Sequence, residues 1–414
     1  MAALLITHIG SLVGLHPADT LMLKGQQMQE LPSLENAWIL CEDGKIADFG
    51  KMNQLPEALP NNLATHDAKG GFVFPSWCDS HTHIVFAASR EEEFVMKIDG
   101  KSYEEIAAAG GGILNSARKL QLASEDTLYE SAALRLTDMI RQGTGAVEIK
   151  SGYGLSLDSE LKMLRVIRRL KENFQIPVKA SFLAAHAYPP EYKNNHEGYI
   201  KLIIDEMLPR VADEGLANYM DAFCEHGFFS VDDTDRLLQA GAKYGLKPKI
   251  HANQLSVSGG VQIGVKHQAI SVDHLEATDD AVIESLQGGN TIATLLPSCS
   301  FYINIPFANA RGLMNANIPV AVATDYNPGS TPSGNMNLVV SLACIKLRMR
   351  PEEAINAATI NGAAAMELSS QTGSIAKGKN ANLFVTRPMS SLAYLPYSFG
   401  QSQIETIIIN GKIS

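Results

Sequence analysis

Short apolar runs alternate with amphipathic segments through the middle of the chain. The apolar runs have the length and the flanking turn residues of buried strands, and they cover residues 71–78, 146–150, 178–184, 248–251, 269–272, 291–295 and 320–323. Between several of these runs, apolar residues recur at helical spacing, over residues 127–142, 159–173, 196–210 and 232–244. Strands separated by such helices indicate right-handed β-α-β units and a parallel sheet. About seven or eight units over ~300 residues match a closed barrel better than an open sheet.

The two ends of the chain have a different pattern. Residues 37–41 and 46–49 are apolar runs on either side of a turn that contains Gly44, which is typical of a hairpin. Residues 381–386 and 405–409 resemble strands, and Asn410-Gly411 is a turn dipeptide. We therefore predict an α/β fold in which residues 71–375 form a (β/α)8 TIM-like barrel. A small β-sandwich domain is expected to combine residues 1–70 with residues 376–414.

Composition and charge narrow the class of protein. The 414 residues are 45% hydrophobic and 19% charged, which is enough apolar material for a large core. The net charge of −10 and the lack of a basic stripe argue against a nucleic-acid partner. No apolar stretch approaches the ~18 residues that span a bilayer, and the first residues lack the cationic region of a signal peptide. The five cysteines are scattered, which suits reduced thiols, so we expect a cytoplasmic protein with no membrane partner.

Polar side chains follow the apolar strands at the end where a barrel carries its chemistry. The first strand ends in Asp-Ser-His81-Thr-His83, and residues two apart on a strand point the same way. Two imidazoles on one side make half of a site for a divalent metal. An H-x-H pair alone is a weak indicator, but other strands also end in polar residues that suit chemistry, namely Lys150, His186, His251, His274 and Asp325. Chance is a poor account of the whole set.

Other histidines and glycines do not fit this pattern. Six histidines are expected to be structural or on the surface: His8, His16, His66, His196, His226 and His267. The glycine clusters at 110–112 and 259–260 lack the spacing of nucleotide-binding loops. The stretch 100–116 is a candidate for a loop that closes over the site.

The strand-end pattern resembles the amidohydrolase superfamily over essentially the whole chain. Six segments are similar, within it, to the imidazolonepropionase family: PSWCDSHTHIVFAASR, VEIKSGYGL, AAH, HANQLS, VDHL and ATDYNPGS. The H-x-H pair indicates only the superfamily, whereas SGYG, Arg90 and DYNPGS indicate the family. The resemblance implies one divalent metal ion per subunit, zinc or iron, with the ligands His81, His83, His251 and Asp325. Three imidazoles and a carboxylate suit either metal.

The resemblance also implies a reaction and a substrate. The family hydrolyses the cyclic amide C–N bond of 4-imidazolone-5-propanoate to N-formimidoyl-L-glutamate, the third step of histidine degradation. Metal-bound hydroxide attacks the ring carbonyl, Asp325 takes the proton of the water, and His274 hydrogen-bonds the carbonyl or the hydroxide. The implied substrate contacts are Arg90, Tyr153, His186, Gln254, Asn327, Gly329 and Ser330. A guanidinium such as Arg90 grips a carboxylate well, and a homodimer is the family-based expectation.

Several alternatives stay open at this point. Gln254 stands where deaminase relatives and some imidazolonepropionases carry a Glu that shuttles protons, and an amide does not titrate. This disfavours an aminohydrolase and leaves His274 or Asp325 to protonate the ring nitrogen. Lys150 ends a strand, so a carboxylated lysine that bridges two metals is an alternative. Arg90 has the alternative of a surface ion pair with one of the glutamates at 91–93.

Rival functions are a sister cyclic-amide hydrolase or aminohydrolase, a non-catalytic barrel and a metal store. The non-catalytic barrel would have lost some of the strand-end residues, and none is missing. A metal store would not require Arg90, Tyr153 and Asn327.

Overall fold

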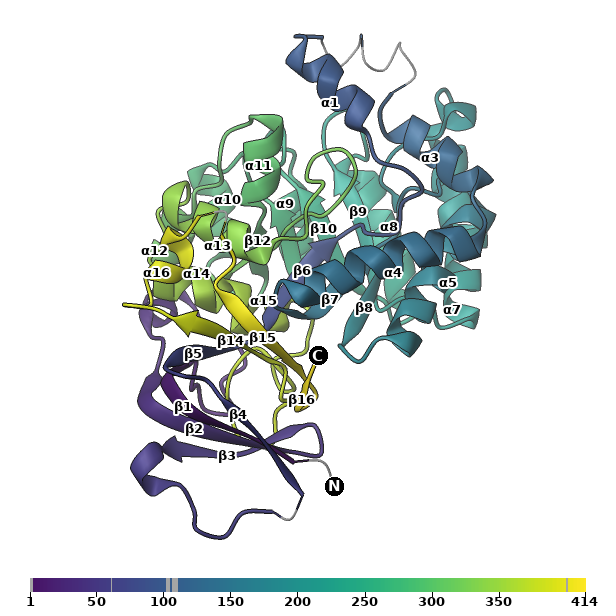
Figure 1. Ribbon diagram of the computed structural model, residues 1–414. Coiled ribbons are helices and arrows are strands. Elements are labelled where there is room, and N and C mark those ends of the chain that lie inside the picture. Colours follow the sequence, from purple (N-terminus) through teal and green to yellow (C-terminus); the bar gives the residue numbers. More distant parts are fainter. Residues whose placement is uncertain (1–2, 61, 102–104, 106–110, 400) are drawn as a thin grey trace.

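A closed barrel of parallel strands forms the larger part of the molecule (Figure 1). The computed structural model describes residues 3–60, 62–101, 105, 111–399 and 401–414. Eight strands pair in sequence order: β6 (Trp77–Thr82), β7 (Thr144–Lys150), β8 (Val178–Ala185), β9 (Tyr219–Cys224), β10 (Lys247–Ala252), β11 (Ser271–His274), β12 (Ile292–Leu295) and β13 (Val320–Val322). A parallel bridge between Thr82 and Tyr326 joins the first strand to the chain beyond the last. The predicted α/β barrel fold is confirmed.

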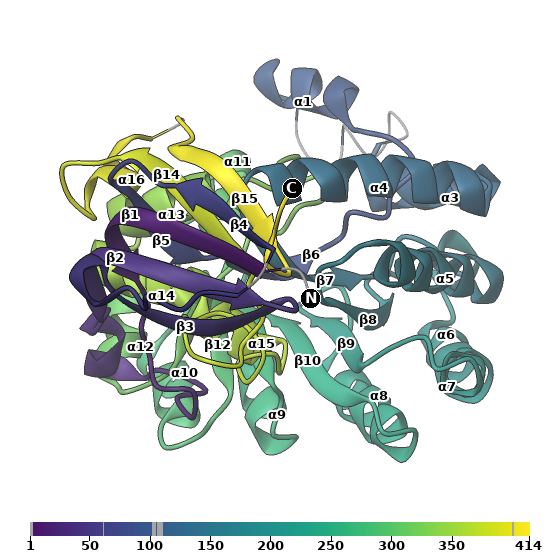
Figure 2. The same cartoon turned by 60° about the horizontal axis from the view of Figure 1, so that its bottom comes forward.

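Helices surround the barrel on its outer side (Figures 1 and 2). They are α1 (Glu91–Ile98), α3 (Ile113–Leu122), α4 (Glu125–Arg141), α5 (Leu157–Asn173), α6 (His196–Lys201), α7 (Leu208–Asp213), α8 (Val231–Lys243), α9 (Gly260–Lys266), α10 (Asp280–Leu286), α11 (Pro297–Ile303), α12 (Ala310–Asn315), α13 (Met336–Ile345), α14 (Pro351–Ala358), α15 (Ile360–Ala365) and α16 (Tyr394–Tyr397). Ser124 and Ser230 cap α4 and α8 by accepting hydrogen bonds from backbone N–H groups of the first turn. No helix of the described residues is long and apolar enough to span a membrane.

Three details differ from the sequence prediction. The run 71–78 is two strands, β5 (Gly71–Pro75) and β6, which lie in different sheets and are separated by Ser76 alone. Strand β9 was not predicted, because Asp221 interrupts its short apolar run. The predicted helix 196–210 contains a π-helical stretch, Leu202–Met207, between α6 and α7. Pro209 lies where the π-helical chain returns to the α-helix, and a proline has no N–H to donate.

The two chain ends form a separate mixed sheet (Figure 2). Its strands run in the order β16 (Lys412–Ile413), β15 (Ile404–Ile409), β14 (Leu383–Pro388), β5, β1 (Ala3–Val13), β2 (Ser33–Glu42) and β3 (Lys45–Lys51), and β4 (Leu63–Asp67) pairs with β1. Hydrogen bonds connect them as one continuous sheet with a hydrophobic cluster of its own. The sheet takes in β5, so it reaches beyond residue 70. The division at residues 70 and 376 stays a prediction.

The connection between β1 and β2 leaves the mixed sheet and runs along the barrel. It contains a short 3-10 helix, Gly25–Gln29; two others are Met52–Gln54 and Pro190–Tyr192. The buried Asn361 side chain accepts from the N–H of Leu23 at 2.9 Å and donates to its carbonyl at 3.0 Å. Asn356 donates to the carbonyls of Met28 and Glu30, and its Oδ1 lies 2.9 Å from Nε2 of His16. Two amides of α14 and α15 thus fix this connection to the barrel.

Candidate active site

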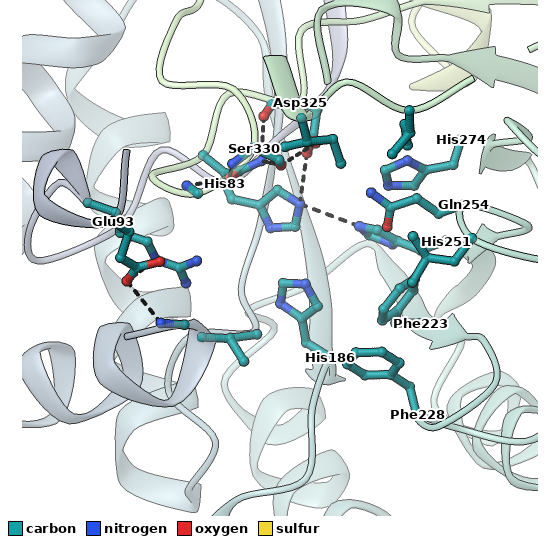
Figure 3. A pocket seen from close by; sticks show the side chains of 18 of the residues that line it. His83, Glu93, His186, Phe223, Phe228, His251, Gln254, His274, Asp325 and Ser330 are labelled. Atoms are coloured by element: carbon teal, nitrogen blue, oxygen red, sulfur yellow. Dashed lines mark hydrogen bonds and ion pairs between the residues drawn. The ribbon is translucent and has the colours of Figure 1, made fainter. Parts of the chain in front are cut away.

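Three imidazoles and one carboxylate meet at the carboxyl end of the barrel, and His83, His251 and Asp325 of this set are labelled in Figure 3. Nε2 of His83 lies 3.3 Å from Nε2 of His81 and 3.4 Å from Nε2 of His251. Oδ1 of Asp325 lies 3.5 Å from Nε2 of His81 and 3.6 Å from Nε2 of His83. All four side chains are buried. The structure therefore brings together the four residues that the sequence predicted as metal ligands.

Two buried carboxylates orient two of these imidazoles. Asp273 Oδ2 lies 2.6 Å from Nδ1 of His81, and Asp221 Oδ1 lies 3.1 Å from Nδ1 of His251. A carboxylate accepts from an N–H, so each ring carries its proton on Nδ1 and turns the lone pair of Nε2 to the centre. Sequence reasoning assigned neither aspartate a role. In the sequence, the feature that could have indicated such a role is an acidic residue inside an otherwise apolar strand.

The arrangement of lone pairs fits a divalent cation. Burial is the main cause that lowers the pKa of His81 and of His251 well below its usual value, which keeps both rings neutral. Lone pairs at such short separations repel one another unless a cation lies between them. Zinc bound tetrahedrally at about 2.0–2.1 Å holds its nitrogen ligands roughly 3.3–3.4 Å apart. Nε2 of His83 has this spacing from Nε2 of His81 and from Nε2 of His251.

Lys150 lies under the site in a buried cluster of charges. Its Nζ donates to Glu148 at 2.6 Å and to Asp221 at 2.8 Å, and it lies 3.4 Å from Asp273. Burial lowers the pKa of Lys150, but these three carboxylates outweigh burial and raise it above the usual value. The ammonium thus connects the two carboxylates that orient His81 and His251. A carboxylated lysine would instead add a negative charge among three acids.

Asp325 is held by the loop after β13. Its N–H donates to the carbonyl of His81 at 3.0 Å, and Ser330 Oγ donates to its Oδ2 at 3.1 Å. Burial, opposed mainly by His274, raises the pKa of Asp325 to about 6. The residue has a φ of 55°, a conformation that a non-glycine residue keeps only where the surroundings fix it. The loop thus fixes the carboxylate toward Nε2 of His81 and Nε2 of His83.

Asp79 fastens β6 to the chain that carries Asp325. The carboxylate of Asp79 accepts from the N–H and the hydroxyl of Thr324 at 3.0 and 2.7 Å. Burial is the main cause that raises the pKa of Asp79, to about 7. Its position two residues before His81 was visible in the sequence, but its partner Thr324, just after β13, was not.

His274 lies beside the four converging groups and points into the same pocket (Figure 3). Its Nδ1 lies 3.4 Å from Oε2 of the buried Glu276, whose other oxygen accepts from Ser300 Oγ at 3.0 Å. Burial lowers the pKa of His274, but Glu276 leads the charges that outweigh burial and raise it. A ring of raised pKa beside Asp325 is a group able to hold a proton.

The pocket above these residues has a volume of about 630 Å³, which suits a small molecule. Each predicted substrate residue lines it: Arg90, Tyr153, His186, Gln254, Asn327, Gly329 and Ser330. Phe223 and Phe228 add an apolar wall (Figure 3). None of the six histidines predicted to lie elsewhere is among its described lining residues. Of the candidate closing loop, Lys101, Gly112 and Ile113 line the pocket, and residues 102–104 and 106–110 lie outside the described residues.

A buried glutamate shapes the loop that carries Tyr153. The carboxylate of Glu160 accepts from the N–H groups of Gly152, Gly154 and Leu155, at 3.1, 2.7 and 2.9 Å. A Cβ at Gly154 would lie 2.4 Å from the backbone nitrogen of Glu160, so only glycine fits there. The same loop directs His186, because the carbonyl of Gly152 lies 3.1 Å from its Nδ1. The SGYG motif therefore supplies backbone N–H groups that bind the carboxylate of Glu160.

Gln254 lies on a loop that a second glutamate holds. Glu225, at the end of β9, accepts from the N–H groups of Leu255 and Ser256, at 2.9 and 3.3 Å. Nε2 of Gln254 lies 3.6 Å from the sulfur of the buried Cys299. Sequence reasoning missed Glu160 and Glu225, since nothing in a single sequence joins a carboxylate to backbone N–H groups of another segment.

Arg90 reaches from the start of α1 into the pocket. Its Nε donates to Ser116 Oγ at 2.8 Å and lies 3.8 Å from Oε1 of Glu93. A Cβ on Gly329 would lie 2.4 Å from Nη1 of Arg90, so the guanidinium lies against the loop after β13. In that loop Asn327 Oδ1 accepts from the N–H groups of Gly329 and Ser330, both at 2.8 Å. Only Nε of Arg90 lies near a glutamate, Glu93. The side chain is 14% exposed, so Arg90 is not a surface residue in an ion pair, as the alternative would require.

Comparisons with known proteins identify the family of the chain. The model of the amidohydrolase family matches residues 72–414. The chain is 57% identical over 410 residues to an imidazolonepropionase of Christiangramia forsetii, with 99% of each chain covered. It is 54% identical over 409 residues to one of Flavobacterium johnsoniae, again with 99% of each covered. Among solved structures, E. coli guanine deaminase has the same fold, with a TM-score of 0.73 at 14% identity over 100% of this chain and 98% of that chain. The chain therefore belongs to the amidohydrolase family and, within it, to the imidazolonepropionases.

Proposed function

We propose that the protein hydrolyses the ring amide of 4-imidazolone-5-propanoate to N-formimidoyl-L-glutamate, a step of histidine degradation. The observation that carries the proposal is one pocket lined by His83, His251 and Asp325 and by the Arg90 guanidinium, with Nε2 of His81 at 3.3 Å from Nε2 of His83. The imidazolonepropionase relatives at 57% and 54% identity support the same substrate. A carboxylate on the substrate would explain the guanidinium.

One divalent ion, zinc or iron, would be held by His81, His83, His251 and Asp325. Such an ion supplies Lewis-acid chemistry, because it lowers the pKa of water and polarises a carbonyl. The ammonium of Lys150 supports a single ion, since it already pairs with the three carboxylates around it. The alternative of a bridging carboxylated lysine has no support in this cluster.

The residues of the chain would bind and orient the substrate from several sides. Arg90 would bind the propanoate, while Asn327, Gly329 and Ser330 would form the side on which the product is held. Tyr153 would close the pocket. Because the carbonyl of Gly152 accepts from Nδ1 of His186, Nε2 of His186 is left to accept from a ring N–H.

The proton balance requires two transfers. Water adds its oxygen to the ring carbonyl carbon, the C–N bond breaks, one proton of the water goes to the departing nitrogen, and the other is released when the carbon becomes a carboxylate. Asp325 would take the proton of the water, and His274 or Asp325 would protonate the nitrogen. Gln254 would contact the ring without exchanging protons, because its amide does not titrate. Gln254 also argues against an aminohydrolase, because that reaction would use a group at this position that exchanges protons.

We also infer a cytoplasmic enzyme, because all five cysteines are free. A homodimer is part of the proposal and would be checked by light scattering. A small molecule, and neither a nucleic acid nor a membrane, would be its partner in the reaction.

The test is the loss of imidazolone absorbance when the purified, metal-loaded protein meets substrate that urocanase makes in situ. We expect rapid loss that a chelator abolishes and that Asp325→Ala removes. Asp232→Ala, a change of the same kind on the exposed start of α8, is the control and should react like the wild type. No loss with fully metal-loaded protein would overturn the proposal in favour of a sister cyclic-amide hydrolase.

A further inference from the structure

A lysine outside the predicted site reaches the same pocket. Helix α1 projects beyond the other helices of the barrel (Figure 1) and carries Lys97 in its last turn. The Nζ of Lys97 donates to the carbonyl oxygen of Gly329 at 3.3 Å, and Lys97 is one of the lining residues of the pocket. An ammonium therefore lies against the loop on which Asn327 and Ser330 are also located.

Gly329 lies between two cations. The guanidinium of Arg90 occupies the space that a side chain at this position would fill, with Nη1 at 2.4 Å from an added Cβ. The ammonium of Lys97 lies at the carbonyl of the same residue. A carboxylate that approaches Arg90 over Gly329 therefore also approaches Lys97.

The charges at this wall of the pocket do not balance. The described lining residues of the pocket include the cations Arg90, Lys97 and Lys101 and two acids, Glu93 and Asp325. Asp325 lies at the base beside His81 and His83, which leaves Glu93 as the acid near Arg90. Oε1 of Glu93 is already shared, because it accepts from the N–H of Gly112 at 2.9 Å and lies 3.8 Å from Nε of Arg90. A surplus of positive charge in a partly enclosed pocket favours one further anion.

The net charge of the whole protein makes such a local surplus more important. At −10, the chain repels an anionic substrate at long range. Arg90, Lys97 and Lys101 in the lining of the pocket oppose this repulsion close to the site. Mobile ions screen their attraction for an anion, so its effect falls as the salt concentration rises.

We propose that Lys97 is a second substrate-binding cation, which with Arg90 brackets the carboxylate of the substrate over Gly329 and sets the preference for an anionic side chain. The inference rests on the proposed function, since the carboxylate in question is that of the propanoate. It adds a binding role on α1 to the residues at the strand ends.

Binding of a stable probe tests the inference without relying on turnover. Isothermal titration of the metal-loaded protein would compare 3-(imidazol-4-yl)propanoate with 4-propylimidazole, which has the same ring and no charge on its side chain. In Lys97→Met we expect the Kd of the propanoate to rise about ten-fold and that of the neutral probe to stay unchanged. Lys97→Arg should keep the Kd of the propanoate within about three-fold of the wild type.

Lys243→Met is the matched control, because it removes the same charge from the exposed last turn of α8. It should bind both probes like the wild type. Equal weakening of both probes in Lys97→Met would assign Lys97 to the placement of the loop and overturn the inference, as would an unchanged Kd for the propanoate or no binding of that probe to the wild type.

Failure of the inference and failure of the proposed function are separable. Turnover of imidazolone without an effect of Lys97→Met on the propanoate probe rejects the inference alone. A selective effect on the propanoate probe without turnover rejects the proposed reaction and leaves the carboxylate site in place. In the active enzyme, kcat should be unchanged by Lys97→Met, while kcat/KM should fall and become less sensitive to salt.

Discussion

Replacing Asp273 by asparagine would test how the layer below the metal ligands acts. The change keeps the shape of the side chain and removes the charge that faces Nδ1 of His81 at 2.6 Å. Asp273 belongs to a buried cluster of two cations and three acids, formed by Lys150, Lys249, Glu148, Asp221 and Asp273. The three acids outnumber the two cations. Asp273→Asn removes one negative charge from this buried cluster, so we expect the variant to fold.

The expected result is weaker binding of the divalent metal. Carboxylates that orient ligating histidines contribute roughly 10–100-fold in metal affinity, which corresponds to about 1.4–2.7 kcal/mol. The contact of Asp221 with Nδ1 of His251 is longer, at 3.1 Å. We therefore expect Asp273→Asn to weaken metal binding more than Asp221→Asn does.

Competition with a chromogenic chelator of known affinity measures this effect, and circular dichroism checks that each variant is folded. Asp280→Asn, the same change on the exposed first turn of α10, should bind metal like the wild type. A folded Asp273→Asn protein whose metal affinity stays within about two-fold of the wild type would refute the role assigned to this layer.

Three further predictions concern other parts of the molecule. Glu160→Gln turns an NH2 group toward backbone N–H donors of the Tyr153 loop; kcat/KM should fall at least about ten-fold, whereas Glu172→Gln on the exposed end of α5 should have no effect. Gln254→Glu should change kcat less than about ten-fold, and a gain of orders of magnitude in a steady-state assay would mean that His274 and Asp325 do not protonate the leaving nitrogen. Burial lowers the pKa of His16 below 6.5, against the hydrogen bond to Asn356. The unfolded chain then binds more protons, so stability is complete above about pH 6.5 and falls below it. His16→Gln should reduce the Tm difference between about pH 7.5 and pH 5.5 in thermal unfolding, and an unchanged difference would contradict this.

The sequence alone was enough to predict which residues lie together where side chains able to bind a metal stand at the ends of strands. His81, His83, His251 and Asp325 each close an apolar run, and in a parallel barrel such ends meet at one rim. The strand alternation likewise predicted the barrel. Short strands were harder, because an acid such as Asp221 in β9 removes the apolar signal while the fold pairs it with Lys150.

Contacts between distant segments could not be predicted from one sequence. Glu160 and Glu225 act through backbone N–H groups, which every residue except proline has, so their partners leave no pattern. The switch from β5 to β6 at Ser76 was equally invisible, since both strands are apolar and only the sheets to which they belong differ. Physical proximity, and not residue type, decides these features.

The pairing of β5 with β14 has a consequence for synthesis of the chain. β5 precedes the barrel and β14 follows it, yet the two strands are hydrogen-bonded neighbours in the mixed sheet. While the ribosome makes the barrel, β5 therefore presents an open strand edge, which is a template for pairing with other chains. We expect a chain truncated before Leu383 to keep that edge open and to aggregate in a sedimentation assay. Strand β14 thus acts as a late closure of the first sheet, which is complete only after the whole barrel has been translated.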